Sequence, residues 1–261
     1  MSFKTLLVDR TDTVVTVIIN RREKLNALSD LVLRELIELS TKLAARREVR
    51  GMLLTGAGDR AFVAGADINA MSRMTVDEGV AFSRLGQEAM DRIEALPFPV
   101  IACVHGYALG GGCELAMAAD YIYATDAAVF GQPESGLGLV PCFGGLVRLI
   151  RLVGPGRAKE LIYTGRNVDA REAHAIGLVN AVFSTRAEMM AAATASLALA
   201  AAKSPVAIAA CKDVLRGLDG KSTAAQLAVE NAAFGRAFAS EDKREGVAAF
   251  VEKRRPAFTG R

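Results

Sequence analysis

GYALGGGCEL, residues 106–115, contains three consecutive glycines at 110–112, and Glu114 follows them by two residues. The residues before it, VIACV at 100–104, are predicted to form a buried strand, and the residues after the glycines to begin a helix. Glycines at such a junction leave backbone N–H groups uncovered at the positive end of a helix, where negative charge is stabilised. Glu114 lies in the first turn of this helix, and the helix dipole alone would favour a carboxylate there.

A second carboxylate follows in FGQPE, residues 130–134. Glu134 directly follows Pro133, and taken alone it is better explained as an ordinary turn residue, as Glu114 taken alone is by its place at the helix start. Taken together, the two glutamates form the kind of pair that proton-transfer chemistry needs, one group accepting a proton while the other donates one. Glu114 and Glu134 are therefore the candidate catalytic residues.

A second loop of small residues, AGADI at 64–68, has the same character as the glycine run. A surface turn explains it as well as a ligand site does. If both loops face one ligand, their N–H groups would form an oxyanion hole. A nucleotide-phosphate loop is disfavoured, because no Gly-Lys-Ser or Gly-Lys-Thr follows the glycines and their spacing is not G-x-G-x-x-G.

Composition excludes several other classes of protein. The chain has 261 residues, 51% of them hydrophobic, which suffices for a large core. No apolar run reaches the roughly 18 residues that span a bilayer, and no signal-peptide pattern opens the chain, so we expect no membrane association. The basic residues are scattered at a net charge of +3, which argues against a nucleic-acid partner.

Cysteine and histidine usage points to a cytoplasmic protein without a metal site. The four cysteines, at 103, 113, 142 and 211, lack paired spacing and are predicted to be reduced thiols. Two histidines and no Cys/His cluster give no basis for a metal. A catalytic serine or cysteine is also disfavoured, because only His105 and His174 are present to activate it.

The elements alternate along the chain. We predict strands at 14–19, 51–55, 100–104, 121–124, 129–130 and 179–183, and helices at 29–46, 77–96 and over most of the chain after 144, including an Ala-rich stretch at 187–210. Pro205 is expected to open a helix after Ser204. Strand–helix units thus fill residues 1–195, and a helical segment that shares contacts with them fills 196–261.

The three loop segments, in this order and spacing, resemble the crotonase (enoyl-CoA hydratase) family. The similarity extends over almost the whole chain, including KLNAL at 24–28 and EGVAAFVEKR at 245–254. The resemblance implies an α/β fold, a spiral of ββα units with a C-terminal helical trimerisation segment, usually assembled as a trimer or a dimer of trimers. It also implies an acyl-CoA thioester substrate, a place in fatty acid metabolism and no metal or redox cofactor.

The resemblance further implies roles by position. The backbone N–H groups of Ala66 and Gly111 would hold the thioester oxygen, while Glu114 as base and Glu134 as acid would act on one water. Because the family's hydratases have both glutamates, the implied activity is hydration of a 2-enoyl-CoA. The residues implied in substrate and CoA binding are Lys24, Ala27, Ala64, Asp67, Ile68, Tyr107, Cys142, Phe234 and Lys253. Phe234 and Lys253 would meet the nucleotide end, often from a neighbouring subunit, although a solvated charge explains Lys253 equally well.

The chain departs from the family pattern at PCFGGLVRL, residues 141–149, where many hydratases read PGAGGTQRL. Cys142 stands in place of a glycine whose N–H positions the water, so the N–H is kept and a thiol is added. Asn69 replaces a common lysine, and Arg22 a common proline. A bulkier wall at Cys142 and Phe143 suggests short acyl chains.

Two alternative functions remain open from the sequence. One is a 3-enoyl-CoA to 2-enoyl-CoA isomerase, which needs a single carboxylate; Glu114 argues against it because the isomerases commonly lack that acid. The other is a weakly catalytic binding protein, for instance for RNA, against which the scattered charge argues.

Overall fold

The computed structural model describes residues 3–218 and 220–261. A central six-stranded sheet has the order β1-β2-β3-β5-β7-β10. Its strands are β1 (Leu6–Thr11), β2 (Val14–Ile19), β3 (Gly51–Gly56), β5 (Val100–Val104), β7 (Tyr121–Thr125) and β10 (Ala181–Phe183). Only β1 pairs antiparallel, and the other neighbours are parallel. Parallel strands are covered on both faces, which is why β3 and β5 read as continuous apolar runs.

A second sheet of four short strands has the order β4-β6-β8-β9. Its strands are β4 (Ala61–Val63), β6 (Tyr107–Leu109), β8 (Val129–Gly131) and β9 (Val168–Asp169). In the chain, β3, β5 and β7 are each followed by one strand of this sheet and then by a helix: α3 (Val76–Glu94), α4 (Gly111–Met117) or α5 (Gly145–Thr164). Three successive ββα units therefore wind into a spiral, and the predicted fold class is confirmed.

Alternate residues of the central strands belong to two separate hydrophobic clusters, each shared with a different layer of helices. Met52 and Leu54 belong to the large core, which also includes buried residues of α1 (Asp30–Ala44) and α3. Leu53, between them, packs instead with Met189 and Leu197 of α7 (Arg186–Ala201). This alternation is the strand period of two, and it places α1 and α7 on opposite faces of the sheet.

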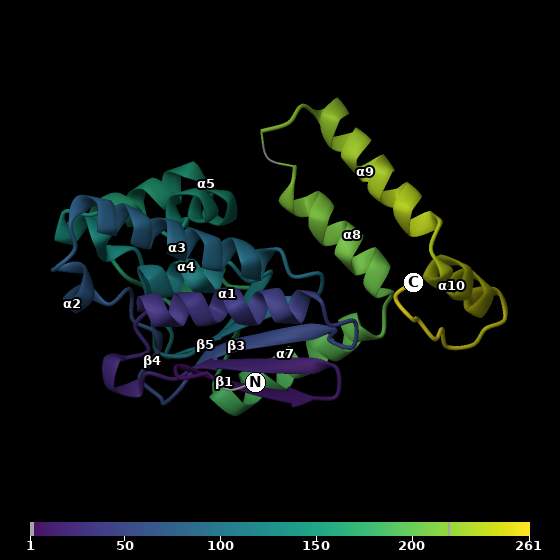
Figure 1. The fold of residues 1–261 in the computed structure, drawn as a ribbon, viewed down its shortest axis with the longest axis horizontal. Helices are drawn as coiled ribbons and strands as arrows, with labels where there is room; N and C mark the ends of the chain where they lie inside the picture. Colours follow the sequence, from purple (N-terminus) through teal and green to yellow (C-terminus); the bar gives the residue numbers. More distant parts are fainter. Residues whose placement is uncertain (1–2, 219) are drawn as a thin grey trace.

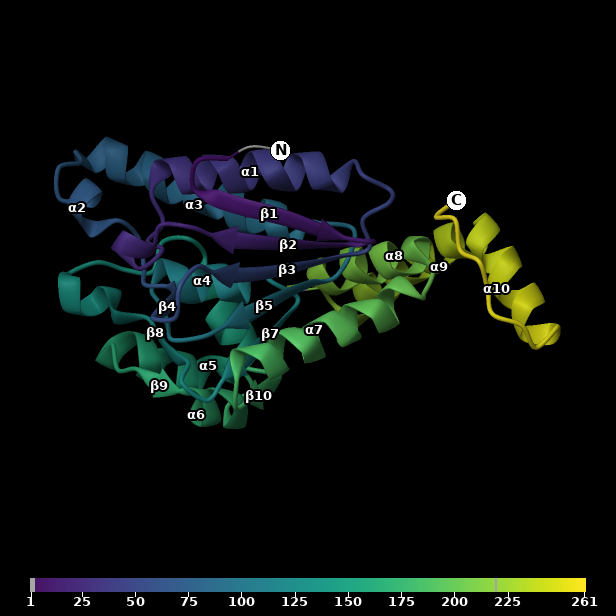
Figure 2. The ribbon, with the colours of Figure 1, turned by 90° about the horizontal axis from the view of Figure 1, so that it is seen from below.

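The three last helices form an arm that leaves the sheets, as Figures 1 and 2 show. They are α8 (Pro205–Arg216), α9 (Thr223–Phe238) and α10 (Glu241–Val251). Lys212 holds α8 to the core by donating to Asp120 Oδ2 at 2.7 Å and to the carbonyl oxygen of Phe98 at 3.0 Å. The expected boundary at residue 195 falls inside α7, whose buried residues Met189, Ala193 and Leu197 lie on both sides of it.

The Ala-rich stretch at 187–210 is not one helix, because α7 and α8 meet at a bend of 108°. The proline ring disfavours a helical conformation at the preceding residue, so Ser204 caps a new helix, as predicted, and its Oγ accepts from Ala207 N. Within the described residues, no single helix is both long and apolar enough to cross a membrane.

Four strands were not predicted: β1, β4, β6 and β9. The last three have only two or three residues and lie in glycine-rich or polar stretches, so periodicity gives no signal for them. Short helices complete the chain, namely η1 (Arg22–Lys24), α2 (Ile68–Met71), η2 (Pro133–Leu137) and α6 (Ala170–Ala175).

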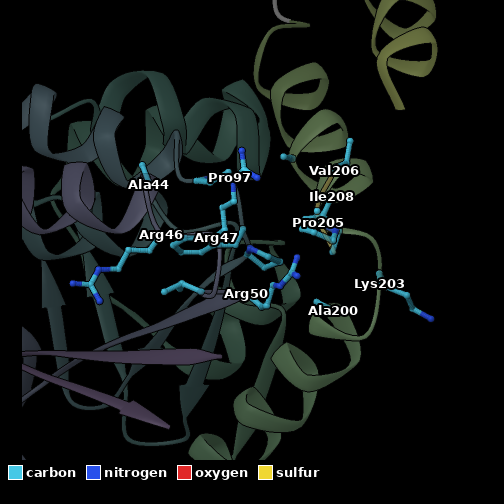
Figure 3. A pocket seen from close by; sticks show the side chains of 15 residues that line it. Ala44, Arg46, Arg47, Arg50, Pro97, Ala200, Lys203, Pro205, Val206 and Ile208 are labelled. Carbon is cyan, nitrogen blue, oxygen red and sulfur yellow. The ribbon is translucent and has the colours of Figure 1, made fainter. Parts of the chain in front are cut away.

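A cavity of about 220 Å³ lies where the arm leaves the core (Figure 3). Pro205 and Val206 of α8 line it together with Arg47 and Arg50. Figure 3 shows Arg46 and Lys203 at its edges with their charged ends directed outward. None of the candidate catalytic or binding residues lines this cavity.

Candidate active site

A second cavity, of about 430 Å³, lies between α2, α3, the start of α4 and the segment 133–143. One of its lining helices, α2, lies at the end of the molecule opposite the arm (Figures 1 and 2). Seven of the predicted site residues line it: Ala64, Ala66, Ile68, Gly111, Glu114, Glu134 and Cys142. Loops far apart in the sequence thus converge on one cavity.

Ala66 and Gly111 both line this cavity, and within the described residues neither backbone N–H has a hydrogen-bond partner. Gly111 is the first residue of α4, where a helix leaves its N–H groups unpaired. The N–H of the preceding Gly110 donates to Gly131 O at 2.9 Å, which fixes the entry to the helix. Unpaired backbone N–H groups are the kind of donor from which an oxyanion hole is built.

The glycines are needed because the backbone at the start of α4 touches its surroundings directly. Gly110 has φ +49°, and a Cβ there would lie 2.6 Å from Oε1 of Glu134. A Cβ on Gly112 would lie 1.9 Å from the carbonyl oxygen of Val63 in β4. The first contact puts the Glu134 carboxylate beside the start of α4, and the second packs α4 against the small sheet.

Glu114 is almost fully enclosed, with 1% of its surface exposed. Its Oε1 accepts from Phe143 N at 2.8 Å and from Gly145 N at 2.7 Å. Burial raises the pKa of Glu114 to about 7, because the loss of hydration outweighs these two hydrogen bonds and the charge of Glu134 adds to it. Such a value suits a group that must both accept and release a proton near neutral pH.

Glu134 lies in the first turn of η2, directly after Pro133, and is partly buried. In the orientation that suits its surroundings, the buried side-chain amide of Gln132 donates to both carboxylate oxygens of Glu134, at 3.2 and 3.1 Å. Burial raises the pKa of Glu134 as well. Gln132 was not among the predicted residues; its only signal was its place two residues before Glu134.

The segment that supplies the N–H donors to Glu114 is fastened to α3. Ser83 Oγ and Gln87 Nε2 donate to the carbonyl oxygen of Cys142 at 2.8 and 3.0 Å. The buried Arg148 donates to the carbonyl oxygen of Phe143 at 3.2 Å, and its guanidinium also contacts Asp91 and Glu94 of α3. Sequence reasoning missed Arg148, since a lone arginine in a helix gives no sign that it will be buried.

Cys142 and Phe143 form one wall of the cavity. The Phe143 ring is fully buried and stands edge-on to Phe82, with centroids 5.3 Å apart. A Cβ on Gly86 of α3 would come within 2.0 Å of Phe143 Cδ1, so the ring rests directly on the helix backbone. Burial raises the pKa of the Cys142 thiol to about 11, so the thiol is neutral.

The other predicted binding residues do not line the cavity. Lys24 and Ala27 lie in the turn beside it, since the neighbouring Leu25 accepts from Ala64 N at 3.0 Å. The Asp67 carboxylate is engaged by Arg21 at 3.0 Å, and Tyr107 opens β6. Phe234 and Lys253 belong to α9 and to the residues after α10, in the arm at the far end of the same chain.

Comparison with known proteins agrees with this geometry. Residues 9–261 match the family model described as enoyl-CoA hydratase/isomerase. The chain is 44% identical to the short-chain-enoyl-CoA hydratase of Clostridium acetobutylicum over 98% of this chain and 97% of the relative. It is 40% identical to the crotonyl-CoA hydratase of Syntrophomonas wolfei, with 99% of each chain covered.

Solved structures show the same architecture. The enoyl-CoA hydratase of Bacillus anthracis superposes with a TM-score of 0.95 at 36% identity, over 99% of this chain and all of the other. Family model, full-length relatives and fold therefore agree. The chain belongs to the enoyl-CoA hydratase/isomerase family.

Proposed function

We propose that this protein is an enoyl-CoA hydratase, which adds water reversibly to a trans-2-enoyl-CoA and gives a 3-hydroxyacyl-CoA. The observation that carries the proposal is a single cavity lined by Glu114, Glu134 and two residues with unpaired backbone N–H groups, Ala66 and Gly111. The hydratase names of the full-length relatives support the same activity.

The N–H groups of Ala66 and Gly111 bind the thioester carbonyl oxygen. Polarisation of this carbonyl makes C3 of the enoyl group electrophilic and stabilises the enolate-like charge that forms on the oxygen. The start of α4 contributes its positive end at the same place. Loss of one such donor typically costs about 3–4 kcal/mol of barrier.

The glutamates act on one water molecule. Glu114 as the base takes a proton from the water, whose oxygen bonds to C3, and Glu134 as the acid gives a proton to C2. Both N–H donors of Glu114 bind Oε1, which leaves Oε2 for the water. The proposed reaction uses only these side chains, the two amides and water, with the CoA thioester as substrate and no metal or redox cofactor.

The wall at Cys142 and Phe143 supports a short acyl chain. Because Phe143 rests on the backbone at Gly86, it can retreat to make room for a longer acyl chain only if α3 moves as well. Two of the relatives are named for short-chain and crotonyl substrates, which agrees with this choice.

We also propose that the protein assembles as a homotrimer or as a dimer of trimers in the cytoplasm. The arm exposes large apolar side chains, among them Phe234, Phe238 and Phe250, which a monomer would leave in water. An arm from a neighbouring subunit would also bring Phe234 and Lys253 to the nucleotide end of the CoA. The four cysteines are unpaired, as expected in a reducing compartment.

Crotonyl-CoA hydration, followed as loss of enoyl absorbance, tests the assignment. We expect Glu114→Gln and Glu134→Gln each to lower kcat by about 10²–10⁴-fold, with CoA binding retained, because each removes one proton-transfer group. Glu38→Gln, an exposed carboxylate on α1, is the matched control and should keep full activity.

An isomerase would respond differently to the same variants, since it needs a single carboxylate. Full activity of Glu114→Gln, or a wild-type protein inactive on every 2-enoyl-CoA, would contradict the hydratase assignment. Conversion of a 3-enoyl-CoA faster than hydration would favour the isomerase.

A further inference from the structure

The loop that presents the Ala66 N–H is held from one side by the turn that precedes α1. On either side of Ala66, Leu28 N donates to Gly65 O and Asp67 N donates to Leu28 O, both at 2.9 Å. Ala64 N donates to Leu25 O at 3.0 Å. These bonds leave the Ala66 N–H free, but all of them depend on where the turn at 21–28 lies.

Arg21 connects this turn to the loop through its side chain. One guanidinium nitrogen donates to the carbonyl oxygen of Ala27 at 2.5 Å, and another lies 3.0 Å from Oδ2 of Asp67. Asp67 Oδ1 in turn accepts from Ala70 N at the start of α2, at 3.3 Å. Both carboxylate oxygens of Asp67 are thus engaged within the protein, one residue away from Ala66.

The pair is shielded from solvent. The side chains of Arg21 and Asp67 are each 16% exposed, whereas those of the Arg34–Asp30 pair on α1 are 64% and 56% exposed. Exposed pairs contribute little because water and salt screen them, and this screening is weaker at partly buried positions. The guanidinium of Arg21 lowers the pKa of Asp67, so the pair stays charged at neutral pH.

We propose that the Arg21–Asp67 ion pair is a positioning element of the oxyanion hole, which holds the Ala66 N–H where the thioester oxygen develops negative charge. This inference rests on the proposed function. Oxyanion donors act only within about 2.7–3.1 Å of that oxygen. A misplacement of about 1 Å can cost about 100-fold in rate, which is why a fixed loop matters here.

Spectroscopy of a bound substrate analogue separates positioning from mere structural support. A cinnamoyl-CoA thioester absorbs at longer wavelength when its carbonyl is polarised, so the shift on binding reports the oxyanion hole directly. The variants are Arg21→Met, Arg21→Lys and Asp67→Asn. Asn still caps α2 but lacks the charge. The control is Arg34→Met, which removes an exposed pair on a neighbouring element.

We expect Arg21→Met and Asp67→Asn to lower kcat for crotonyl-CoA by about 10- to 100-fold while KM changes much less. The wavelength shift of bound cinnamoyl-CoA should shrink in the same variants, and Arg21→Lys should recover part of both. The double variant Arg21→Met/Asp67→Asn should be no slower than the slower single variant, because both changes break one interaction. Arg34→Met should behave like the wild type.

A folded Arg21→Met with wild-type kcat and an unchanged wavelength shift would overturn the inference. If that variant does not fold, a folded Asp67→Asn with wild-type values would overturn it instead. If the variants lower both the thermal midpoint and kcat but leave the wavelength shift unchanged, the inference is overturned and the pair has a structural role only. A wild type inactive on all enoyl-CoAs would instead refute the proposed function, so the two failures are distinguishable.

Discussion

At the scale of single residues, the balance at Glu114 is between hydration and hydrogen bonding. Two backbone donors favour its ionised form, yet burial prevails and raises the pKa to about 7. The same enclosure that disfavours the charge makes the carboxylate a suitable base at neutral pH. We therefore expect the hydration rate to fall as the pH drops through about 7 and Glu114 becomes protonated.

Glu114 should also make folding pH-dependent. Its folded pKa of about 7 lies above the ordinary value of 4.5, so its contribution to stability is fully present below about pH 4.5 and is lost as the pH rises through about 7. The loss is on the order of 3 kcal/mol. Glutamine does not titrate, so Glu114→Gln does not lose stability in this way. The thermal midpoint of the variant minus that of the wild type should therefore increase from pH 5 to pH 8. Parallel curves for wild type and variant over this range would contradict the assigned pKa, and Glu38→Gln serves as the exposed control.

Cys142 provides a second test at this scale. The wild type should turn over crotonyl-CoA faster than dodecenoyl-CoA, and Cys142→Ala should raise the relative rate on dodecenoyl-CoA by about tenfold, because it removes bulk from the acyl wall. Cys211→Ala is the matched control, since Cys211 is exposed on α8. Faster turnover of dodecenoyl-CoA by the wild type would refute the short-chain proposal.

At the scale of elements, the site depends on how β6 turns into α4. The turn at Gly110 brings the first N–H of the helix into the cavity, and Gly112 lets the helix lie against β4. Across the cavity, Ser83 of α3 donates to the carbonyl oxygen of Cys142. Arg148 of α5 donates to the carbonyl oxygen of Phe143 and is itself paired with carboxylates of α3. One half of the site is therefore positioned by the turn into α4 and its contact with β4, and the other half by side chains of α3 and α5.

Gly112→Ala tests this packing. The added Cβ would lie 1.9 Å from the carbonyl oxygen of Val63, so α4 must move. We expect a loss of about 1–3 kcal/mol in the free energy of unfolding and a lower kcat, as the Gly111 N–H shifts with the helix. Gly156→Ala in α5, where nothing lies within 4 Å, is the control and should not lower the thermal midpoint. Equal midpoints for the two variants would contradict the close approach of α4 and β4.

At the scale of the whole molecule, the arm lies at one end and α2, which lines the candidate active site, lies at the other (Figure 1). The arm exposes Phe234, at 63%, and Phe250, at 86%, while Lys212 anchors its first helix to Asp120. An anchored arm with apolar side chains in water is suited to burial against other subunits. The active site would then be completed by an arm that comes from elsewhere in the assembly.

Phe234→Glu should therefore reduce the oligomeric state without unfolding the subunit. Analytical ultracentrifugation is expected to show a smaller species, while circular dichroism keeps the helical signal. Leu7→Glu on β1, 47% exposed and far from the arm, is the control and should keep the wild-type mass. A monomeric wild type, or an unchanged mass for Phe234→Glu, would contradict the proposed assembly.

The sequence by itself determined the alternation of strands and helices, the cap at Ser204 and the loops that carry Ala66, Gly111, Glu114 and Glu134. The hydrophobic periodicity and the positions of the glycines in the sequence are enough to predict these features. Only the tertiary structure decided the rest. The partners of Arg21 and Arg148 lie far away in the sequence, and the roles of Gln132 and Arg148 depend on their burial. The same holds for β4, β6 and β9, which are strands because of the neighbours they pair with. A pKa near 7 at Glu114 likewise arises from enclosure by segments that meet only in the folded chain.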